Sequence, residues 1–333
     1  MAAPKLYVDG QLVVWGERLF HSPLRKARIV DDPTQGGRKL LPNHLNRAAY
    51  VRGAIERSLR RSPEVMVKIT SKKDAGRGMA RIRPHLEYIA RNGKLPLEDQ
   101  DGNLIEGWGE LKDLERDWQY AGLGIPETSN RREAINVIFS MPSGTDAQIL
   151  KDAVKSVATE EFANHRFVMA LHDDTDHTHI HICLQAKNHL GKYLNPRKAD
   201  LGRWRESFAQ QLRERGVDAN ATPRKTRGVT QQYAKQAVLH QKKRQPAKFP
   251  DRHRHADDLV SSHKPQLHAW AQCIQSLGES EDPNDRMLAK RIDQFTAEMP
   301  IVREISQQRS LSKGKPRSES RPSAKPTLKR KPR

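Results

Sequence analysis

Hydrophobic residues in the middle of the chain alternate with polar ones in short runs that predict β-strands. Val65, Val67 and Ile69 fall on one side of residues 64–69. Similar short apolar runs, bounded by polar or turn-forming residues, predict three further strands. These strands cover residues 135–140, 167–171 and 177–184.

Helical spacing of apolar residues appears between these runs. Thr145 and Gln148 have the spacing of a capping box, and apolar positions continue to about 162, so a helix is expected there. Another helix is expected over 203–215, where Trp204, Phe208 and Leu212 share a face before Gly216. Two earlier segments also favour helices. One is the cationic stretch 44–61, and the other starts at Pro84, carries Tyr88 and ends at Gly93.

Strands interleaved with helices predict an α/β (α+β) fold in which helices flank one antiparallel central sheet. We expect this domain to span residues 63–230, after a basic N-terminal extension over 1–62. Residues 94–130 are polar and glycine-rich and predict an irregular insertion. Residues 231–310 form a basic, partly helical region with a helical patch near 267–277, and the Lys-, Arg- and Pro-rich residues 311–333 predict a disordered basic tail.

The charge balance narrows the range of partners. The net charge is +20, which favours nucleic acid as the partner, with an anionic membrane second and a role in solubility alone third. The chain has no apolar run of 18 residues and no secretory signal pattern, so we expect no membrane insertion. Two distant cysteines fit a reducing compartment. The sequence contains no phosphate-binding loop motif, which argues against an ATP-driven motor.

Candidate metal chemistry is concentrated in residues 170–185, ALHDDTDHTHIHICLQ, which hold four of the 14 histidines. On a strand, His177, His179 and His181 point to one face. If residues 173–176 form a hairpin turn, His172 lies across from His177 and joins that face. Three imidazoles suffice to hold a divalent ion with positions left open for substrate, although an exposed hairpin with ordinary polar histidines is the alternative. Imidazole suits zinc, manganese and other transition ions, whereas magnesium prefers oxygen.

Aspartates in the expected turn offer oxygen atoms beside the histidines. Asp173, Asp174 and Asp176 can act as ligands or orient ring N–H groups, or serve simply as turn residues.

A metal ion and a basic surface together indicate phosphodiester chemistry. Tyr88 is a candidate nucleophile because Arg83, Arg91 and Lys94 flank it, and these cations would bind the DNA backbone and favour a phenolate. Taken alone, a tyrosine is more often a core or stacking aromatic residue.

Three motifs carry a family resemblance when they are read together. They are HLEYIARNGKLPLEDQDG around Tyr88, FSMPSG over 139–144 and LHDDTDHTHIHICLQ over 171–185. In this order they resemble the relaxase/mobilisation nuclease family of conjugative relaxases, and within it the T-DNA border endonucleases of type IV secretion systems. The resemblance implies an HUH-endonuclease-like domain.

The resemblance also implies roles for individual residues. Tyr88 would be the nucleophile, and His172, His179 and His181 would hold one Mg²⁺ or Mn²⁺ ion. The supporting residues would be His177, Asp173 and Asp176, and the DNA contacts would be Arg83, Arg91, Lys94, Ser140 and Ser143. The serines have an alternative interpretation as strand-end and turn residues.

The implied function is strand-specific nicking and rejoining of DNA at a transfer origin through a 5′-phosphotyrosyl intermediate, which initiates conjugative transfer. Expected partners are single-stranded or locally melted origin-of-transfer DNA, a relaxosome accessory protein and a type IV coupling protein. The expected location is the bacterial cytoplasm, with export while covalently bound to DNA through a type IV secretion system as a further option. The tail would then be a secretion signal, a nonspecific DNA-binding arm or a nuclear-localisation-like segment.

Several alternatives stay open from the sequence. Tyr50, on the Arg-rich helix of the extension, is the second choice for the nucleophile. A rolling-circle replication initiator would use a tyrosine after the histidines, either Tyr193 or Tyr233. The other rivals are a non-catalytic, zinc-stabilised DNA-binding protein and a metal-dependent hydrolytic nuclease.

Overall fold

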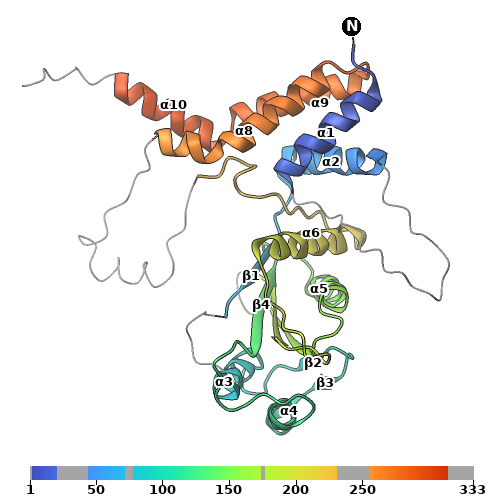
Figure 1. Cartoon of the computed structure of the whole chain (residues 1–333), viewed down its shortest axis with the longest axis vertical. Helices are drawn as coiled ribbons and strands as arrows, with labels where there is room; N and C mark the ends of the chain where they lie inside the picture. Colours follow the sequence, from blue (N-terminus) through green and yellow to red (C-terminus); the bar gives the residue numbers. More distant parts are fainter. Residues whose placement is uncertain (1, 21–43, 72–77, 174–176, 231–255, 314–333) are drawn as a thin grey trace, which may run out of the picture.

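The computed structural model describes residues 2–20, 44–71, 78–173, 177–230 and 256–313. These residues form an α+β domain built on one sheet and a bundle of helices that packs beside it (Figure 1). The fold class predicted from the sequence is therefore confirmed. No helix among the described residues is long and apolar enough to cross a membrane.

The described part of the sheet has six strands in the order β1-β4-β6-β5-β2-β3, and every pair of neighbours is antiparallel. Their bounds are β1 Met66–Ile69, β2 Leu97–Asp99, β3 Leu104–Ile105, β4 Ala134–Ser140, β5 Phe167–His172 and β6 His179–Gln185. The β5–β6 hairpin thus lies in the middle of the sheet, flanked on one side by β4 and on the other by β2.

Each face of the sheet is covered by its own pair of helices because side chains alternate along the strands. Met169, Ile180 and Ile182 pack with helices α5 (Ala147–Glu161) and α6 (Lys198–Glu214). Val168, Ala170 and Cys183, on the opposite face, pack with α3 (Met79–Ile89) and α4 (Gly107–Tyr120). Side chains that share the second face therefore look towards α3.

The register of the hairpin differs from the sequence expectation. His172 pairs with His179 rather than with His177, and Ala170 pairs with His181. β6 begins at His179, so His177 precedes the strand. The physical reason is that pairing across a hairpin depends on the conformation of its turn, which the alternation of side chains does not specify.

The expectation of an irregular insertion over 94–130 is wrong, because this segment contains β2, β3 and α4. Leu97, Leu111 and Trp118 from it are buried against α3 and the sheet. These apolar residues are widely spaced, so their common core forms only when the segment folds back on β5.

Three helix starts also differ from expectation, and one of them is that of α6, which begins at Lys198 rather than at 203. Helix α3 begins at Met79 and contains Pro84, because the backbone N–H groups of Met79 and Ala80 donate to the carbonyls of Pro126 and Glu127. These partners lie far along the chain and are not visible in local sequence. Helix α5 is capped by Asp146, whose carboxylate accepts the N–H of Ile149 at 2.8 Å, rather than by a Thr145–Gln148 box.

The helical bundle is built from helices near both ends of the described chain, an arrangement that the sequence did not indicate. It contains α1 Lys5–Leu19, α2 His44–Leu59, α8 Ala256–Gly278, α9 Pro283–Ala297 and α10 Pro300–Lys313. Leu12, Ile55, Trp270 and Ile292 are buried in its shared core. Arg52 crosses this core and forms ion pairs with Asp9 at 2.6 Å and Asp285 at 3.0 Å.

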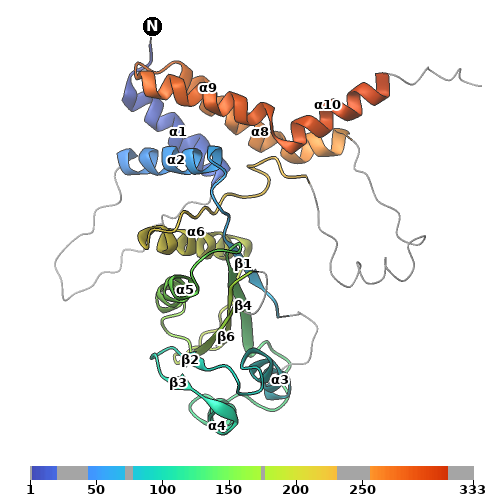
Figure 2. The ribbon, with the colours of Figure 1, turned by 180° about the vertical axis from the view of Figure 1, so that it is seen from behind.

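The bundle lies against the α6 side of the sheet, whereas α3 and α4 lie at the far end of the domain (Figures 1 and 2). The strap formed by residues 219–229 makes the connection. The indole N–H of Trp270 donates to the carbonyl of Thr226 at 2.8 Å, and the N–H of Ile301 donates to that of Gly228 at 3.0 Å. Of the expected disordered tail, residues 311–313 end α10, and residues 314–333 lie outside the described part of the chain.

Candidate active site

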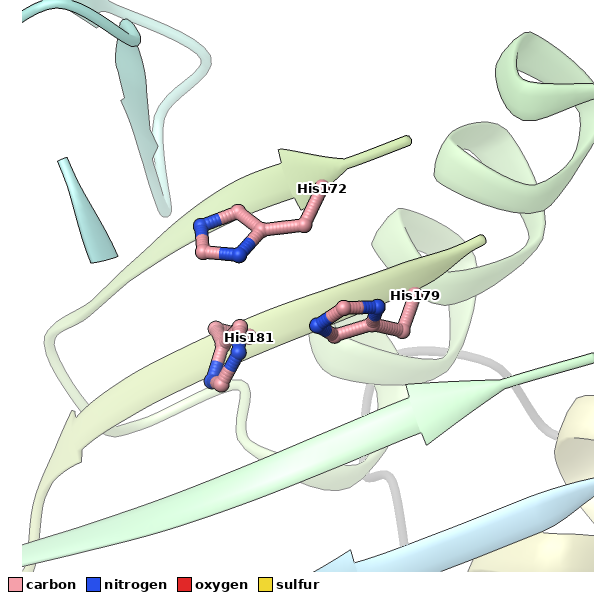
Figure 3. A group of neighbouring side chains, drawn as sticks. All are labelled: His172, His179 and His181. Carbon is pink, nitrogen blue, oxygen red and sulfur yellow. The ribbon is translucent and has the colours of Figure 1, made fainter. Parts of the chain in front are cut away.

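Three histidines converge on the face of the sheet that looks towards α3. His172 ends β5, and His179 and His181 lie on β6 beside it (Figure 3). Their ring centroids are 4.6 Å apart for His172 and His181, 5.0 Å for His179 and His181, and 5.2 Å for His172 and His179. One nitrogen from each ring lies within 4.8 Å of the other two, so a single ion can reach all three.

Backbone carbonyls select the ring nitrogen that each of two histidines presents. Nε2 of His172 lies 2.8 Å from the carbonyl oxygen of Ile89, and Nδ1 of His179 lies 2.9 Å from that of His177. Because a carbonyl only accepts, each of these nitrogens carries the proton. The other nitrogen of each ring therefore carries a lone pair that can bind a metal ion, and in His172 this nitrogen, Nδ1, lies 3.5 Å from Nη2 of Arg91.

His181 has the properties of a metal ligand. It is buried, and its Nδ1 has no hydrogen-bond partner among the described residues. Burial, reinforced by His172 and His179, lowers the pKa of His181 to about 3. The ring is consequently neutral at physiological pH, and an unpaired buried nitrogen is costly unless something binds it. The three side chains thus fit a divalent cation.

Tyr88 lies on the last turn of α3, directly over the histidines. Its ring centroid is 5.9 Å from that of His181 and 6.3 Å from that of His172, and the side chain is 54% exposed. The hydrogen bond between His172 and Ile89, the residue after Tyr88, ties the helix to the hairpin. The structure therefore brings the tyrosine and the three histidines together from segments more than 80 residues apart.

The three flanking cations occupy different environments. The guanidinium carbon of Arg91 lies 5.6 Å from the centre of the Tyr88 ring, and its Nη2 lies 3.5 Å from Nδ1 of His172. Lys94 is exposed. Arg83 instead forms an ion pair with Glu127 and a 2.9 Å hydrogen bond with Gln119, so it holds α3 to the loop after α4.

The structure describes four of the remaining expected site residues: Ser140, Ser143, Asp173 and His177. Ser140 is buried opposite His179, and its hydroxyl donates to the carbonyl of Thr178 at 3.2 Å. Ser143 and Asp173 are exposed, and Asp174 and Asp176 lie outside the described residues. His177 is also exposed, and its carbonyl oxygen orients His179.

His85 is a site residue that the sequence reasoning missed. It lies one turn before Tyr88 on α3, with its ring stacked 6.3 Å from that of Tyr88 and 6.2 Å from that of His181. Burial lowers the pKa of His85 to about 4, and its Nε2 has no partner among the described residues. The three-residue spacing from Tyr88 was the available signal, because such residues share a helix face.

The other candidate tyrosines lie elsewhere. Tyr50 is in the helical bundle and hydrogen-bonds to Glu206 of α6, on the opposite side of the sheet, and burial together with this glutamate raises its pKa. Tyr193 lies under the guanidinium of Arg131, 5.7 Å from the ring centre, and its hydroxyl is 3.5 Å from Glu133. Tyr233 lies outside the described residues.

Two hollows flank the turn after Tyr88. One, of about 400 Å³, is lined by Arg91, Asn92, Lys94, Leu95 and Asp173. The other, of about 280 Å³, is lined by Pro84, Glu87, Tyr88, Arg91 and Asn92. Arg91 therefore borders both hollows, whereas Tyr88 borders only the smaller one and Lys94 only the larger one.

The antiparallel sheet and the histidine triad on its central hairpin are consistent with a relaxase nuclease domain. Residues 102–217 match the family model described as a relaxase, MobA/VirD2-like, nuclease domain. The match includes all three histidines and begins after Tyr88. Residues 102–217 are therefore similar to the relaxase nuclease domains of this family.

The particular relatives are T-DNA border endonucleases. The chain is 26% identical to VirD2 of Rhizobium radiobacter over 195 residues, which cover 52% of this chain and 46% of the relative. It is 25% identical to VirD2 of Agrobacterium fabrum over 194 residues, covering 52% of this chain and 43% of that protein. It is 28% identical to VirD2 of Rhizobium rhizogenes over 126 residues, covering 34% and 29%. The matches thus span less than half the length of these relatives, and no solved structure matches.

Proposed function

We propose that this chain nicks and rejoins one DNA strand at a transfer origin and thereby initiates conjugative transfer. The observation that carries the proposal is the position of Tyr88, whose ring lies 5.9 Å from His181 and over a triad suited to one metal ion. The family match supports the nuclease activity, and the names of the relatives support DNA border or origin sequences as the substrate.

The proposed reaction is a transesterification. The hydroxyl oxygen of Tyr88 attacks the scissile phosphorus, a bond forms between them, and the bond from phosphorus to the 3′-oxygen breaks. The phenolic proton passes to solvent, and the leaving 3′-oxygen takes up a proton to become a free 3′-OH. The product is a 5′-phosphotyrosyl link, and attack by a 3′-OH reverses the reaction without ATP because one phosphodiester replaces another.

His172, His179 and His181 would hold the ion, and we propose Mg²⁺ or Mn²⁺. When bound, it would polarise a phosphate oxygen and stabilise the charge of the transition state. The hydrogen bonds from His172 and His179 to backbone carbonyls fix both rings for this role. His177 contributes through its carbonyl, and Asp173 and Asp176 remain proposed supporting residues.

The proposed substrate is single-stranded or locally melted origin DNA, because a phosphate must be accessible to Tyr88 on an open surface. Arg91 lies beside the tyrosine and, with Lys94 of the adjoining hollow and the exposed Ser143, would bind the backbone. Arg83 and Ser140 are already engaged with protein groups, so we assign them positioning roles. A relaxosome accessory protein and a type IV coupling protein are proposed partners, with action in the bacterial cytoplasm and export of the DNA-linked protein.

A covalent-adduct assay tests this function. The full chain is incubated with Mn²⁺ or Mg²⁺ and end-labelled single-stranded oligonucleotides that tile the DNA element encoding it, and products are resolved on a denaturing gel. We expect a metal-dependent protein–DNA band that is absent in Tyr88→Phe and in His179→Ala. Tyr193→Phe is the matched control, because Tyr193 is also exposed but lies beside Arg131.

Each other outcome supports a different function. Cleavage without a covalent band would indicate a hydrolytic nuclease. A band that survives in Tyr88→Phe but disappears in a Tyr193 or Tyr233 variant would indicate the chemistry of a rolling-circle initiator. Tight zinc binding with no cleavage of any oligonucleotide would indicate a zinc-stabilised DNA-binding protein.

A further inference from the structure

A run of three residues in the left-handed conformation follows α3. Arg91, Asn92 and Gly93 have φ values of 49°, 57° and 78°. For residues other than glycine this conformation is strained, so two such residues in succession need support from the surrounding structure. The run begins three residues after Tyr88.

Hydrogen bonds and one close packing contact hold this turn. The N–H of Asn92 donates to the carbonyl of Glu87 at 2.8 Å, and that of Leu95 donates to Ala90 at 3.0 Å. A Cβ atom on Gly93 would lie 2.7 Å from backbone atoms of Gly107 and Trp108 at the start of α4. The turn is therefore packed tightly between the end of α3 and the start of α4.

The reversal of the chain places the Arg91 side chain back over the active site. Its guanidinium lies over the Tyr88 ring at 5.6 Å and within 3.5 Å of a His172 nitrogen, so it spans the nucleophile and the triad. It also borders the hollows on both sides of the turn. A phosphate between Tyr88 and the histidines would lie within reach of this group.

We propose that Arg91 is a catalytic residue that binds a non-bridging oxygen of the scissile phosphate and stabilises its negative charge as Tyr88 attacks. This inference rests on the proposed nicking function and assigns Arg91 more than backbone binding. A guanidinium is planar and always charged, and its paired N–H groups match phosphate oxygens. It stays protonated throughout, so the bonds formed and broken and the proton balance are those of the transesterification above.

The test compares Arg91→Gln and Arg91→Lys with the wild type in single-turnover adduct formation, using the oligonucleotide identified by the tiling assay. Arg131→Gln is the matched control, because Arg131 has the same relation to a tyrosine ring at 5.7 Å but lies beside Tyr193. We expect Arg91→Gln to slow adduct formation by about 100- to 1,000-fold, as removal of one transition-state donor does elsewhere. The affinity for the oligonucleotide is measured by fluorescence anisotropy in proteins that also carry Tyr88→Phe, so that no adduct forms. In this background Arg91→Gln should change the affinity by less than about tenfold.

Sulfur substitution at the scissile phosphate separates catalysis from folding or positioning. In each of the two phosphorothioate diastereomers, sulfur stands in place of a different non-bridging oxygen. For the oxygen bound by Arg91, we expect sulfur to slow the wild type by about tenfold or more and to have little further effect on Arg91→Gln, because the contact is already lost. The effect of the other diastereomer should persist in the variant.

The outcomes distinguish this inference from the function on which it rests. If wild type forms the metal-dependent adduct and Arg91→Gln matches it, or if both sulfur effects persist unchanged in the variant, Arg91 is not catalytic and the nicking function stands. A loss in Arg91→Gln explained entirely by weaker binding would likewise overturn the inference. If wild type forms no adduct, the proposed function itself fails.

Discussion

Gly93→Ala tests whether the contact between the turn after α3 and the start of α4 positions the active site. The substitution adds one methyl group at φ +78°, where it would meet backbone atoms of Gly107 and Trp108 at 2.7 Å. Backbone atoms cannot rotate away as a flexible side chain can. We therefore expect the two helices to separate slightly and to shift Tyr88 and Arg91.

The expected loss of folding stability has two parts, and the same substitution at a second glycine separates them. A left-handed alanine costs about 1–2 kcal/mol, and overpacking adds about 1–3 kcal/mol. Gly191 has the same φ of +78°, but its nearest neighbour is the end of the Lys187 side chain at 4.0 Å. Gly191→Ala should therefore lose only the conformational part, and Gly93→Ala should lose about 1–3 kcal/mol more.

Urea unfolding followed by tryptophan fluorescence and circular dichroism would measure both variants against the wild type. Adduct formation, tested under conditions in which each variant is folded, should fall further in Gly93→Ala than in Gly191→Ala. Equal losses of stability in the two variants would refute the packing argument. Normal adduct formation in a destabilised Gly93→Ala would show that the contact does not position Tyr88.

Three further predictions concern the helical bundle, the strap bound by Glu64 and the histidine triad. Arg52→Ala should destabilise the protein by about 3–5 kcal/mol in thermal or urea unfolding, because it leaves two buried aspartates without their counter-ion. Burial raises the pKa of Glu64 to about 7 from 4.5, so the stability it contributes is present below pH 4.5 and is lost as pH rises through 7. The stability of wild type relative to Glu64→Gln should fall by up to about 3 kcal/mol between pH 4.5 and 8, and a flat difference would contradict this. In calorimetry, His181→Ala should weaken Mn²⁺ binding at least about tenfold, whereas His165→Ala, which alters a histidine bonded to the Gln185 carbonyl, should not.

Local patterns predicted the elements that bury one regularly spaced set of apolar side chains in the sheet core. The alternation around 135–140 and 167–171 corresponds to β4 and β5, and the helix spacing after 145 and 203 corresponds to α5 and α6. In these segments one face is buried against the sheet core, so the sequence period matches the structure. The segment 94–130 lacks such a period because each of its elements contributes only a few residues to a core made mostly by others.

The candidate site was predictable in its residue types but not in its geometry. Alternation in HTHIH predicted that His177, His179 and His181 share one face, and this holds in β6 for His179 and His181 but not for His177, which precedes the strand. The pairing partner of His172 depended on the turn, and the part played by His85 depended on how α3 lies against the hairpin. Neither of these is recorded by the spacing of residues along one strand.

From the sequence we could infer the α+β class, a cluster of histidines on a hairpin and the excess of positive charge, because each follows from periodicity or composition within a short stretch of chain. Tyr88 and the set of three histidines were singled out by the motifs of the family resemblance. Tertiary structure alone decided that Tyr88 meets His181, that Arg91 turns back over both, and that α1 and α2 share one core with α8, α9 and α10. Some of these residues are far apart along the chain, and Arg91 is directed by a strained turn. Only the packing of whole elements against one another brings such residues together.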